Sequence, residues 1–465
     1  MTYFFETYGC QMNIAESASV ERAFIEAGWT KADDVQVADF VIINTCSVRE
    51  TAESRILGRL GWYASLKAVR KLEERAKNHV FPKAHSYALT NKENPPRLNL
   101  AIMGCMAERL IDSLQKDYPV LDYVIGNFQK QYFPDIIAAV EKGEKWIETD
   151  EKPHYVFAES SYEKGSHSAF VPIMHGCNNF CSYCIVPYVR GREVSRSPES
   201  IFAEIDALSK NGVKEITFLG QNVNSYIWEE EGKEAIDFPS LMQAVSQHIH
   251  ATKSSIGWIR FMSSHPKDIS PDLIQLVKKD PLFCKHIHLP VQHGSNAILD
   301  AMRRKYTREA YLEKIAAIKK EIPGVSLSTD IMIGFPGETI EDFEETIALM
   351  REVAFENAFM YYYNPREGTK AADMQEQLSI KEKKRRLALV IAEQQAISKR
   401  LMEERLGESV RVLAEGFSKD NPEELVGRTE RDERVVFPAG PEKIGHFVEV
   451  FLTELTGATL RGKIV

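Results

Sequence analysis

The chain has 465 residues, and its composition, 44% hydrophobic and 27% charged, is typical of a globular protein with about two to four domains. Lys and Arg total 58 and Asp and Glu total 67, so the formal net charge is −9 and any surface that binds a polyanion must be local. The N-terminus has no basic region, and no segment approaches membrane-spanning length. We therefore expect a soluble, cytoplasmic protein with no membrane partner.

The first 145 residues alternate apolar runs with amphipathic segments. Runs typical of strands are YFFET, DFVIINT, LNLAIMG and YVIGN, and segments with helical spacing follow them. Strands that alternate with helices predict an N-terminal domain, residues 1–145, built on an open parallel α/β sheet.

Three cysteines of this domain share one position relative to the predicted strands. Cys10, Cys46 and Cys105 are far apart in the sequence, yet each lies just after the end of a strand. The carboxyl ends of parallel strands share the edge where ligands bind, so three thiols can converge there on one iron–sulfur cluster. The alternative is three unrelated buried cysteines, which is the commoner fate of any single one. Their shared placement favours the cluster.

The segment 61–99 is predicted to be an insertion between the second and third of these cysteine units. It holds eight Lys or Arg residues and three Glu residues, so it is locally basic. One hypothesis is an arm that faces a polyanion. The other is a solvated helix followed by a proline-containing loop, and the composition is compatible with both.

The strongest local signal is HGCNNFCSYC, which holds Cys177, Cys181 and Cys184 in a C-x3-C-x2-C triplet. The chain has only seven cysteines, and grouped thiols in such a chain indicate a metal site rather than disulfides. A four-iron cluster normally takes four Cys ligands, so three leave one iron open for a ligand or substrate. Cys284 stands alone and is predicted to be buried and structural.

Residues 166–375 are predicted to form an open, partial β/α barrel. Six runs typical of strands alternate with amphipathic helices, and they are VPIMH, VKEITFLGQNV, WIRFMSS, KHIHLPVQ, VSLSTDIMIGF and NAFMYYYN. A closed barrel of this kind needs eight strands, so six predict an open one. Its active site is expected at the carboxyl edge of the strands.

The C-terminal part of the chain has a different pattern. A helix with the basic start KEKKRR, residues 381–386, leads to residues 402–465, where short β runs are broken by Gly, Pro and Asn. This pattern predicts a small antiparallel β-barrel. Such barrels often bind nucleic acid, but this segment carries more acidic than basic residues, and fold analogy is a weak basis for a function.

In their order and spacing, these blocks resemble the radical S-adenosylmethionine (SAM) methylthiotransferase family over nearly the whole chain. The resemblance rests on GCQMN, NTCSVRE, GCMAERL, GCNNFCSYCIVPYVRGRE, LGQNVNSY, SSHPKD, HLPVQHGS and GFPGET. The first and fourth blocks most resemble the branch that acts on isopentenylated adenosine in tRNA. The implied fold class is α/β, with an N-terminal open parallel α/β domain, a central partial (β/α)6 radical-SAM barrel and a C-terminal TRAM barrel. The long insertion and the residues IAESAS after GCQMN depart from the family pattern.

The resemblance implies two [4Fe-4S] clusters. Cys177, Cys181 and Cys184 would hold the radical cluster, whose open iron binds SAM, and Cys10, Cys46 and Cys105 an auxiliary cluster that carries the sulfur to be transferred. One SAM would methylate that sulfur and a second would supply the 5′-deoxyadenosyl radical for methylthiolation at C2 of the adenosine next to the anticodon. No residue is expected to act as a catalytic acid or base, and we expect the substrate adenine to lie between the two clusters.

Other blocks supply candidate binding residues. For SAM these are Gln221, Ser264, Gln292, Gly334 and Gly337, and for the substrate they are Arg190, Arg192, Tyr361 and Tyr363. Each has an alternative role. The glycines could serve only a tight turn, the glutamines could cap strands, the arginines could be ion-paired and the tyrosines could pack in the core.

The expected partners are a tRNA that carries N6-isopentenyladenosine, an external electron donor and a sulfur source, and we expect a monomer. RNA is expected to contact the KEKKRR helix, the C-terminal barrel and the insertion. Two other readings of the family signal are a sister methylthiotransferase that acts on threonylcarbamoyl-adenosine or on a ribosomal protein, and a non-catalytic iron–sulfur RNA-binding protein. The latter would hold clusters without cleaving SAM.

Overall fold

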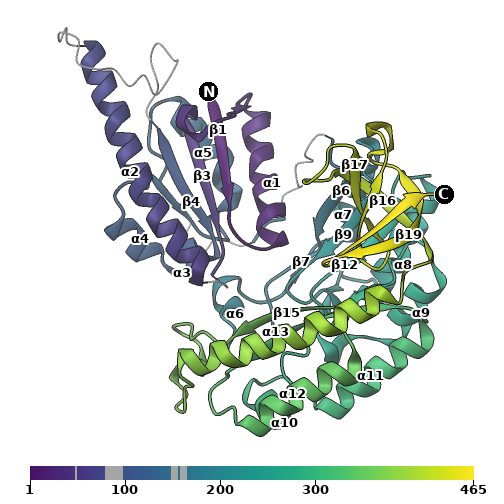
Figure 1. Cartoon of the computed structure of the whole chain (residues 1–465). Helices are drawn as coiled ribbons and strands as arrows, with labels where there is room; N and C mark the ends of the chain where they lie inside the picture. Colours follow the sequence, from purple (N-terminus) through teal and green to yellow (C-terminus); the bar gives the residue numbers. More distant parts are fainter. Residues whose placement is uncertain (48–49, 79–97, 148–154, 158–164) are drawn as a thin grey trace. The chain divides into compact units, whose positions relative to one another are not determined.

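The computed structural model describes residues 1–47, 50–78, 98–147, 155–157 and 165–465 (Figure 1). The chain divides into two compact units. The first comprises residues 1–161 and 188–191, and the second comprises residues 162–187 and 192–465. None of the helices in the described residues is long and apolar enough to span a membrane.

The first unit is built on a five-stranded, wholly parallel sheet with the order β2-β1-β3-β4-β5. The strands are β1 (Thr2–Thr7), β2 (Thr30–Lys31), β3 (Phe40–Thr45), β4 (Asn99–Gly104) and β5 (Tyr123–Ile125). β3 is buried at every position because it is the central strand, and its sequence FVIINT is accordingly a nearly continuous apolar run. The predicted parallel sheet is confirmed. The edge strand β2 was not predicted, because a strand of two residues is too short to show an alternating hydrophobic pattern.

Helices cover both faces of this sheet (Figure 1). They are α1 (Gln11–Glu26), α2 (Glu50–Asn78), α3 (Cys105–Arg109), α4 (Ile111–Asp117) and α5 (Phe133–Glu141). Side chains alternate along β3, so Phe40 packs in the cluster with α1 and α5, whereas Val41 packs in the cluster with α2 and α4. With both faces covered, the carboxyl ends of the strands are left for a site.

The start of the predicted insertion belongs to the long helix α2, and residues 79–97 lie outside the described residues. Two of its basic side chains hold the helix on the unit. Arg70 is buried and donates to the carbonyls of Ala38 and Gln36, and Lys67 pairs with Asp122. These two cations are therefore used for packing, and the hypothesis of a polyanion-facing arm stays a prediction for the rest of the segment.

The second unit contains six parallel strands that form a partial barrel. They are β6 (Ser168–Pro172), β9 (Glu215–Leu219), β12 (Trp258–Phe261), β13 (His286–His288), β14 (Ser326–Ile333) and β15 (Asn357–Tyr362). Their order is β6-β9-β12 and β13-β14-β15, and the parallel bridge between Ile259 and Phe283 joins the two halves. Within the described residues β6 and β15 are not paired, so the barrel is open as predicted.

Helices connect these strands and enclose one large apolar core. They are α7 (Pro198–Lys210), α8 (Phe238–Ala251), α9 (Pro271–Lys279), α10 (Asn296–Ala301), α11 (Arg308–Glu321), α12 (Ile340–Val353) and α13 (Ile380–Glu403), and α6 (Val186–Val189) lies where the chain passes between the units. Two short hairpins complete the unit, β7 (Met174–His175) with β8 (Val194–Ser195) and β10 (Ile227–Trp228) with β11 (Ile236–Asp237).

The C-terminal residues form a closed barrel in the order β16-β17-β18-β20-β19. Its strands are β16 (Ser409–Phe417), β17 (Glu424–Thr429), β18 (Arg434–Pro438), β19 (Phe447–Thr456) and β20 (Thr459–Ile464). The prediction of a wholly antiparallel barrel needs one correction, because β18 and β20 pair in parallel. A closed ring with an odd number of strands cannot alternate direction at every neighbour, so one parallel pair is unavoidable.

The C-terminal barrel packs on the amino ends of the strands of the partial barrel. The Trp258 ring, at the start of β12, meets the Phe447 ring edge-on with 4.7 Å between the centroids. Arg260 is buried and donates to the Thr429 carbonyl at 2.6 Å and to Glu215 Oε2 at 2.7 Å. The two barrels therefore share a buried junction within the second unit.

The basic start of α13 is only partly available to a partner. Lys383 and Arg386 are buried on the same helical stripe as Val390 and Gln394, and they bind the Tyr363 carbonyl and the Glu338 carboxylate. The exposed residue Arg385 pairs with Glu382 on its own helix. Lys383 and Arg386 are therefore used for packing, and contact of RNA with this helix stays a prediction that rests on its exposed cations.

Candidate functional site

The cysteine triplet lies on a loop that the hairpin β7–β8 closes. Asn178 lies at the neck of this loop, where its backbone N–H and its Nδ2 each donate to the Glu193 carboxylate at 3.1 Å. Gly176 and Phe180 adopt left-handed φ values of 81° and 48°, which turn the backbone sharply on both sides of Cys177. These turns and hydrogen bonds fold the segment that carries the three cysteines into a loop.

Polar groups contact the sulfur atoms of this loop. Arg304 donates from Nη1 to Cys181 Sγ at 3.4 Å, and Asn179 donates from Nδ2 to Cys177 Sγ at 3.6 Å. Burial raises the pKa of the Cys177 thiol and raises that of Cys184 to about 12, with the neighbouring Cys181 adding to the effect. Such thiols keep their protons in the absence of a metal and lose them when a metal binds. The loop is therefore suited to binding a cluster and not to holding free thiolates.

The backbone of the loop is anchored to neighbouring segments. Ser182 donates from its N–H to the Met302 carbonyl at 3.1 Å and from its hydroxyl to the Ala301 carbonyl at 2.7 Å, and its own carbonyl accepts from Ala371. A buried apolar cluster lies beside it and includes Met302, Met332 and Phe335. These contacts fix the loop and keep water from one side of it.

Arg304 is a residue that sequence reasoning missed. It is 5% exposed, and besides Cys181 it binds the Pro290 carbonyl at 3.0 Å and the Tyr306 hydroxyl at 3.0 Å. Its neighbour Arg303 is exposed. Nothing in MRRKY distinguishes the two arginines, because only the fold decides which of them turns inward.

The candidate SAM residues lie at the carboxyl ends of successive strands, as expected for a shared edge. Gln221, Ser264 and Gln292 follow β9, β12 and β13, and Gly334 follows β14 directly. Two buried polar atoms at this edge, Gln221 Oε1 and Asn224 Nδ2, have no hydrogen-bond partner among the described residues. Buried orphans of this kind indicate a polar ligand, so the edge fits SAM. The individual assignments stay predictions.

Other polar groups at this edge bind each other. Ser264 Oγ donates to Asn224 Oδ1 at 3.0 Å, and Gln292 Oε1 accepts from the Tyr361 hydroxyl at 3.3 Å. Tyr361 is exposed and also interacts electrostatically with Cys184 and Arg304. The structure therefore brings Gln292 and Tyr361 together beside the cluster loop.

The two candidate glycines have left-handed backbones, with φ of 69° at Gly334 and 81° at Gly337. Their N–H groups are used inside the protein, since Gly334 donates to Glu338 Oε2 at 2.5 Å and Gly337 to the Glu376 carbonyl at 3.2 Å. Glu338, also missed from the sequence, is buried. Burial alone would raise the pKa of the Glu338 carboxyl, but His293 and Arg386 outweigh it and lower that pKa.

The remaining candidate substrate residues of the second unit have different environments. Tyr363 is 1% exposed and packs edge-on against Phe335, with 5.3 Å between the centroids. Core packing therefore occupies this ring, and Tyr362 also packs on the main core. Arg192 lies over the Phe180 ring at 4.4 Å from its centroid, beside the cysteine loop. Substrate binding by Arg192, Tyr361 and Tyr363 stays a prediction.

In the first unit, the predicted strand-end cysteines follow β1, β3 and β4, and Cys105 is the first residue of α3. Cys10 is exposed, and its N–H and Sγ both donate to Asn13 Oδ1, at 3.2 and 3.3 Å. A hydrogen bond with Cys46 and the charge of Arg190 lower the pKa of Cys10 to about 6. A lowered thiol pKa favours the thiolate that binds iron.

Cys46 and Cys105 follow the last residues of two neighbouring strands, Thr45 and Gly104, which pair with each other. Asn13 Nδ2 donates to the Thr45 carbonyl at 3.0 Å, which ties the Cys10 loop to the residue before Cys46. Asn127 Nδ2 lies 3.8 Å from Cys105 Sγ. The three cysteines thus fit a shared cluster, although their assignment as ligands stays a prediction. Among the described residues, no three His, Cys, Asp or Glu side chains are close enough together to hold a single metal ion. This is compatible with a cluster, because the ligands of a four-iron cluster stand further apart than those of one ion.

Arg190 belongs to this first unit and is 3% exposed. It donates to both oxygens of Glu16, at 2.7 and 3.2 Å, and Lys130 lies 2.6 Å from the same carboxylate. Burial alone would raise the pKa of Glu16, but the two cations outweigh it and lower that pKa. This environment matches the alternative role given for Arg190 in the sequence analysis, that of an ion-paired arginine. The solitary Cys284 is buried, as predicted.

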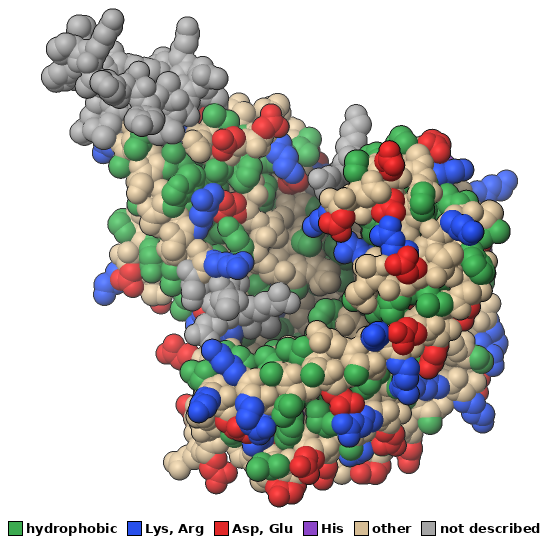
Figure 2. Space-filling model, in the orientation of Figure 1, with side chains coloured by type: hydrophobic (Ala, Val, Ile, Leu, Met, Phe, Trp, Pro, Cys, Tyr) green, Lys and Arg blue, Asp and Glu red, His purple; other side chains and the backbone are tan. Residues whose placement is uncertain are grey.

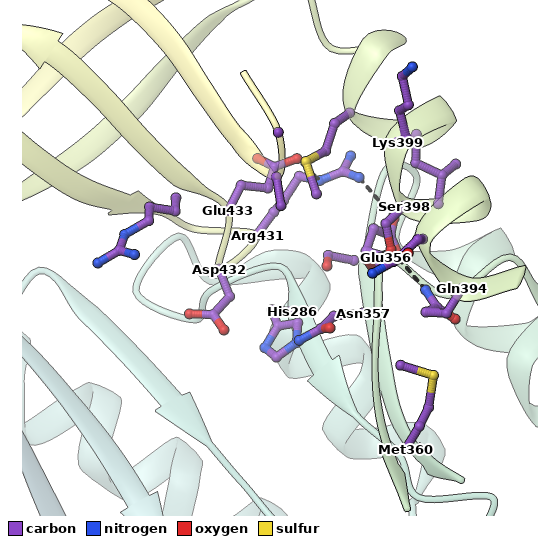
Figure 3. A pocket seen from close by; sticks show the side chains of 17 residues that line it. His286, Glu356, Asn357, Met360, Gln394, Ser398, Lys399, Arg431, Asp432 and Glu433 are labelled. Carbon is purple, nitrogen blue, oxygen red and sulfur yellow. Dashed lines mark hydrogen bonds and ion pairs between the residues drawn. The ribbon is translucent and has the colours of Figure 1, made fainter. Parts of the chain in front are cut away.

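A cavity of about 630 Å³ lies at the opposite, amino edge of the partial barrel (Figure 3). His286, Ser326 and Asn357 begin β13, β14 and β15 and line it, together with residues of α13 and of the β17–β18 turn. It contains none of the candidate residues named from the sequence. On the face drawn in Figure 2, Lys and Arg side chains are interspersed with Asp and Glu, in line with the acidic net charge.

Comparison with known proteins defines the class. Family models match for the Radical SAM superfamily over residues 171–350, the Uncharacterized protein family UPF0004 over residues 2–73 and the TRAM domain over residues 403–465. The radical S-adenosylmethionine methyltransferase TsrM from Kitasatospora setae, solved with cobalamin and a [4Fe-4S] cluster, is similar in fold. Its TM-score is 0.56 at 12% identity, over 80% of this chain and 74% of that one. The chain is a radical SAM enzyme.

Full-length relatives narrow the family. The tRNA-2-methylthio-N(6)-dimethylallyladenosine synthase of Treponema pallidum (strain Nichols) is 48% identical over 100% of this chain and 99% of its own length. That of Treponema denticola is 46% identical over all of both chains, and that of Phocaeicola vulgatus is 43% identical over 99% and 95%. The chain belongs to the tRNA-2-methylthio-N(6)-dimethylallyladenosine synthase family. The predicted family and fold class are confirmed, and the cofactors are [4Fe-4S] clusters and SAM.

Proposed function

We propose that this enzyme adds a methylthio group to C2 of N6-isopentenyladenosine next to the anticodon of tRNA. The observation that carries the proposal is the identity of 48% with a synthase named for this product, over the whole of this chain. Both sets of cysteines that the chemistry needs are present, one set after strands of the parallel sheet of the first unit and the other on the loop that follows β7. The relatives give no support to a sister substrate or to a non-catalytic role.

The residues of the second unit would bind and orient SAM at the radical cluster. A cluster and SAM bound there would supply the radical chemistry, and the residues of this unit would orient SAM for it. Cys177, Cys181 and Cys184 hold the cluster, Arg304 donates to the sulfur of Cys181, and the orphan atoms of Gln221 and Asn224 offer SAM an acceptor and a donor. The apolar cluster beside the loop excludes water from a reactive radical.

The first unit would hold the auxiliary cluster on Cys10, Cys46 and Cys105, and the C-terminal barrel would help to bind tRNA. Three domains, residues 1–145, 166–375 and 402–465, would divide these tasks. We propose a cytoplasmic monomer that takes electrons from an external donor and sulfur from a separate source. Exposed cations such as Lys384 and Lys381 on α13 are candidates for phosphate contacts.

The decisive experiment is anaerobic reconstitution followed by iron counting and incubation with SAM, a reductant and isopentenylated tRNA. We expect iron for two four-iron clusters and methylthiolated tRNA by mass spectrometry of nucleosides. Cys181→Ala should abolish 5′-deoxyadenosine, whereas Cys10→Ala should keep it and lose the methylthio product. If Cys10→Ala still methylthiolated tRNA, the auxiliary assignment would be wrong. If methylthiolated product formed only with tRNA that carries threonylcarbamoyl-adenosine, the proposed substrate would be wrong.

A further inference from the structure

The short segment 188–191 differs from its neighbours in the chain, because it belongs to the first unit while the residues on both sides belong to the second. Buried contacts hold it there. Asn127 Nδ2 donates to the Val189 carbonyl at 2.7 Å, and the adjacent Arg190 reaches both oxygens of Glu16. The chain thus returns to the first unit only a few residues after Cys184.

This segment ends beside the auxiliary cysteines. The same Asn127 amide that binds Val189 also contacts Cys105 Sγ at 3.8 Å. The Arg190 guanidinium interacts electrostatically with Cys105 and Cys10, and Lys130 interacts with Cys105. Two positive side chains therefore act electrostatically on the proposed ligands of the auxiliary cluster.

Helix α1 links these charges to the cysteine loops. Asn13 and Glu16 are three residues apart and lie on one face of α1. Asn13 binds Cys10 and the Thr45 carbonyl, and Glu16 binds Arg190 and Lys130. All four side chains of this network are buried or nearly so, and within it two cations face one anion. The network therefore carries a net positive charge where water cannot screen it.

We propose that Arg190 is a positioning residue for the auxiliary cluster. With Lys130 and Glu16 it forms a buried network of net positive charge. This network fixes the cysteine-bearing loops and favours negative charge on the cluster. This inference rests on the proposed function only in that the three cysteines bind a cluster. It replaces a direct contact of Arg190 with substrate, because Glu16 occupies its guanidinium.

The net charge of this network predicts the direction in which each substitution shifts the reduction of the cluster. A cluster held by three thiolates becomes more negative when it is reduced, so a nearby positive charge favours reduction. Arg190→Gln removes one cation and should disfavour the reduced cluster. Glu16→Gln removes the anion and should favour it. A purely structural role would not give opposite signs.

The experiment uses the full chain with Cys177, Cys181 and Cys184 all changed to Ala, so that only the auxiliary cluster is loaded. Iron content and an anaerobic redox titration followed by electron paramagnetic resonance are measured for the parent and for Arg190→Gln, Arg190→Lys and Glu16→Gln. Arg22→Gln, on the exposed side of the same helix α1, is the matched control. No tRNA or SAM is needed, so failure of the proposed substrate does not affect the result.

We expect the ratio of reduced to oxidised cluster at a fixed potential to fall about tenfold in Arg190→Gln and to rise in Glu16→Gln. Arg190→Lys and Arg22→Gln should stay close to the parent. Equal potentials in all variants, or shifts of the same sign in Arg190→Gln and Glu16→Gln, would overturn the proposal. If Arg190→Gln failed to hold iron, a raised potential in Glu16→Gln with a parental one in Arg190→Lys would still support it. An unchanged Glu16→Gln would refute it.

Discussion

Two adjacent arginines of the second unit have opposite environments. Arg304 is 5% exposed and directs its guanidinium to Cys181 Sγ and to the Pro290 carbonyl, whereas Arg303 is exposed. A buried guanidinium that donates to a cysteine sulfur stabilises a thiolate and so stabilises the bound cluster. At the scale of single residues, burial separates positions that have the same chemistry.

Arg304→Gln is expected to weaken the radical cluster. It removes charge-assisted hydrogen bonds worth about 1.5–3 kcal/mol each, so iron retention at this site and 5′-deoxyadenosine formation should both fall. Arg303→Gln is the matched control and should change the free energy of unfolding by less than about 0.5 kcal/mol. Iron counting and product analysis on both variants check this. Equal losses in the two would contradict the role of Arg304.

His286 predicts a pH dependence of stability. Burial lowers the pKa of its imidazole from 6.5 to about 4, so the folded protein keeps it neutral at a pH where the unfolded chain binds a proton. Stability is therefore fully present above pH 6.5 and is lost as the pH falls from 6.5 towards 4, by roughly 3 kcal/mol in total. Urea unfolding of cluster-free protein should show this slope, and His286→Gln should reduce it. A slope unchanged by the substitution would exclude His286 as its source.

At the scale of elements, the turn after β14 joins a strand, a helix and the start of α13. The Gly334 N–H, the Arg386 guanidinium and His293 all bind Glu338, and Lys383 packs against Gly334. This turn therefore serves packing as well as any contact with SAM. Residues of GFPGE that look like ligand contacts in sequence are in part structural.

Gly334→Ala is expected to destabilise the second unit more than Gly368→Ala does. Both glycines have positive φ, 69° and 83°, so both substitutions introduce backbone strain of about 1 kcal/mol. A Cβ at Gly334 would also lie 2.6 Å from Lys383 Cγ, whereas one at Gly368 would meet nothing within 4 Å. The overlap should add about 1–3 kcal/mol, measured as a lower urea midpoint. Equal midpoints would show that Lys383 can move aside.

At the scale of the whole molecule, the second unit joins two barrels through a buried junction. Glu215 begins β9 and Arg260 lies within β12, and they bind Arg428 and the Thr429 carbonyl of the C-terminal barrel. Trp258 and Phe447 pack beside them. The C-terminal barrel therefore stabilises the partial barrel in addition to any role in binding RNA.

Phe447→Ala should uncouple the two barrels. It removes the ring that packs on Trp258 and leaves a cavity at the junction, with a cost of about 3 kcal/mol. Phe451→Ala, on the same strand but 36% exposed, is the control and should cost much less. Calorimetry is expected to show a lower or split transition for Phe447→Ala only. A single unshifted transition would mean that the junction contributes little stability.

The sequence alone determined the longer strands, the parallel direction of the two main sheets and the positions of the six candidate cysteines, because each of these follows from a local pattern. A buried central strand such as β3 is an apolar run, and C-x3-C-x2-C is a single loop. The common edge of Cys10, Cys46 and Cys105 followed from the rule that parallel strands end together. The confirmed fold class and family rest on these signals.

Only the tertiary structure decided which polar side chains turn inward. Arg190, Arg304, Glu338 and Lys383 are charged residues whose local sequence does not indicate burial, yet each is buried against a partner distant in the chain. The single parallel pair of the C-terminal barrel likewise depends on ring closure. Contacts between distant segments leave no periodic trace in a sequence, so their charge and hydrogen-bond balance is visible only after folding.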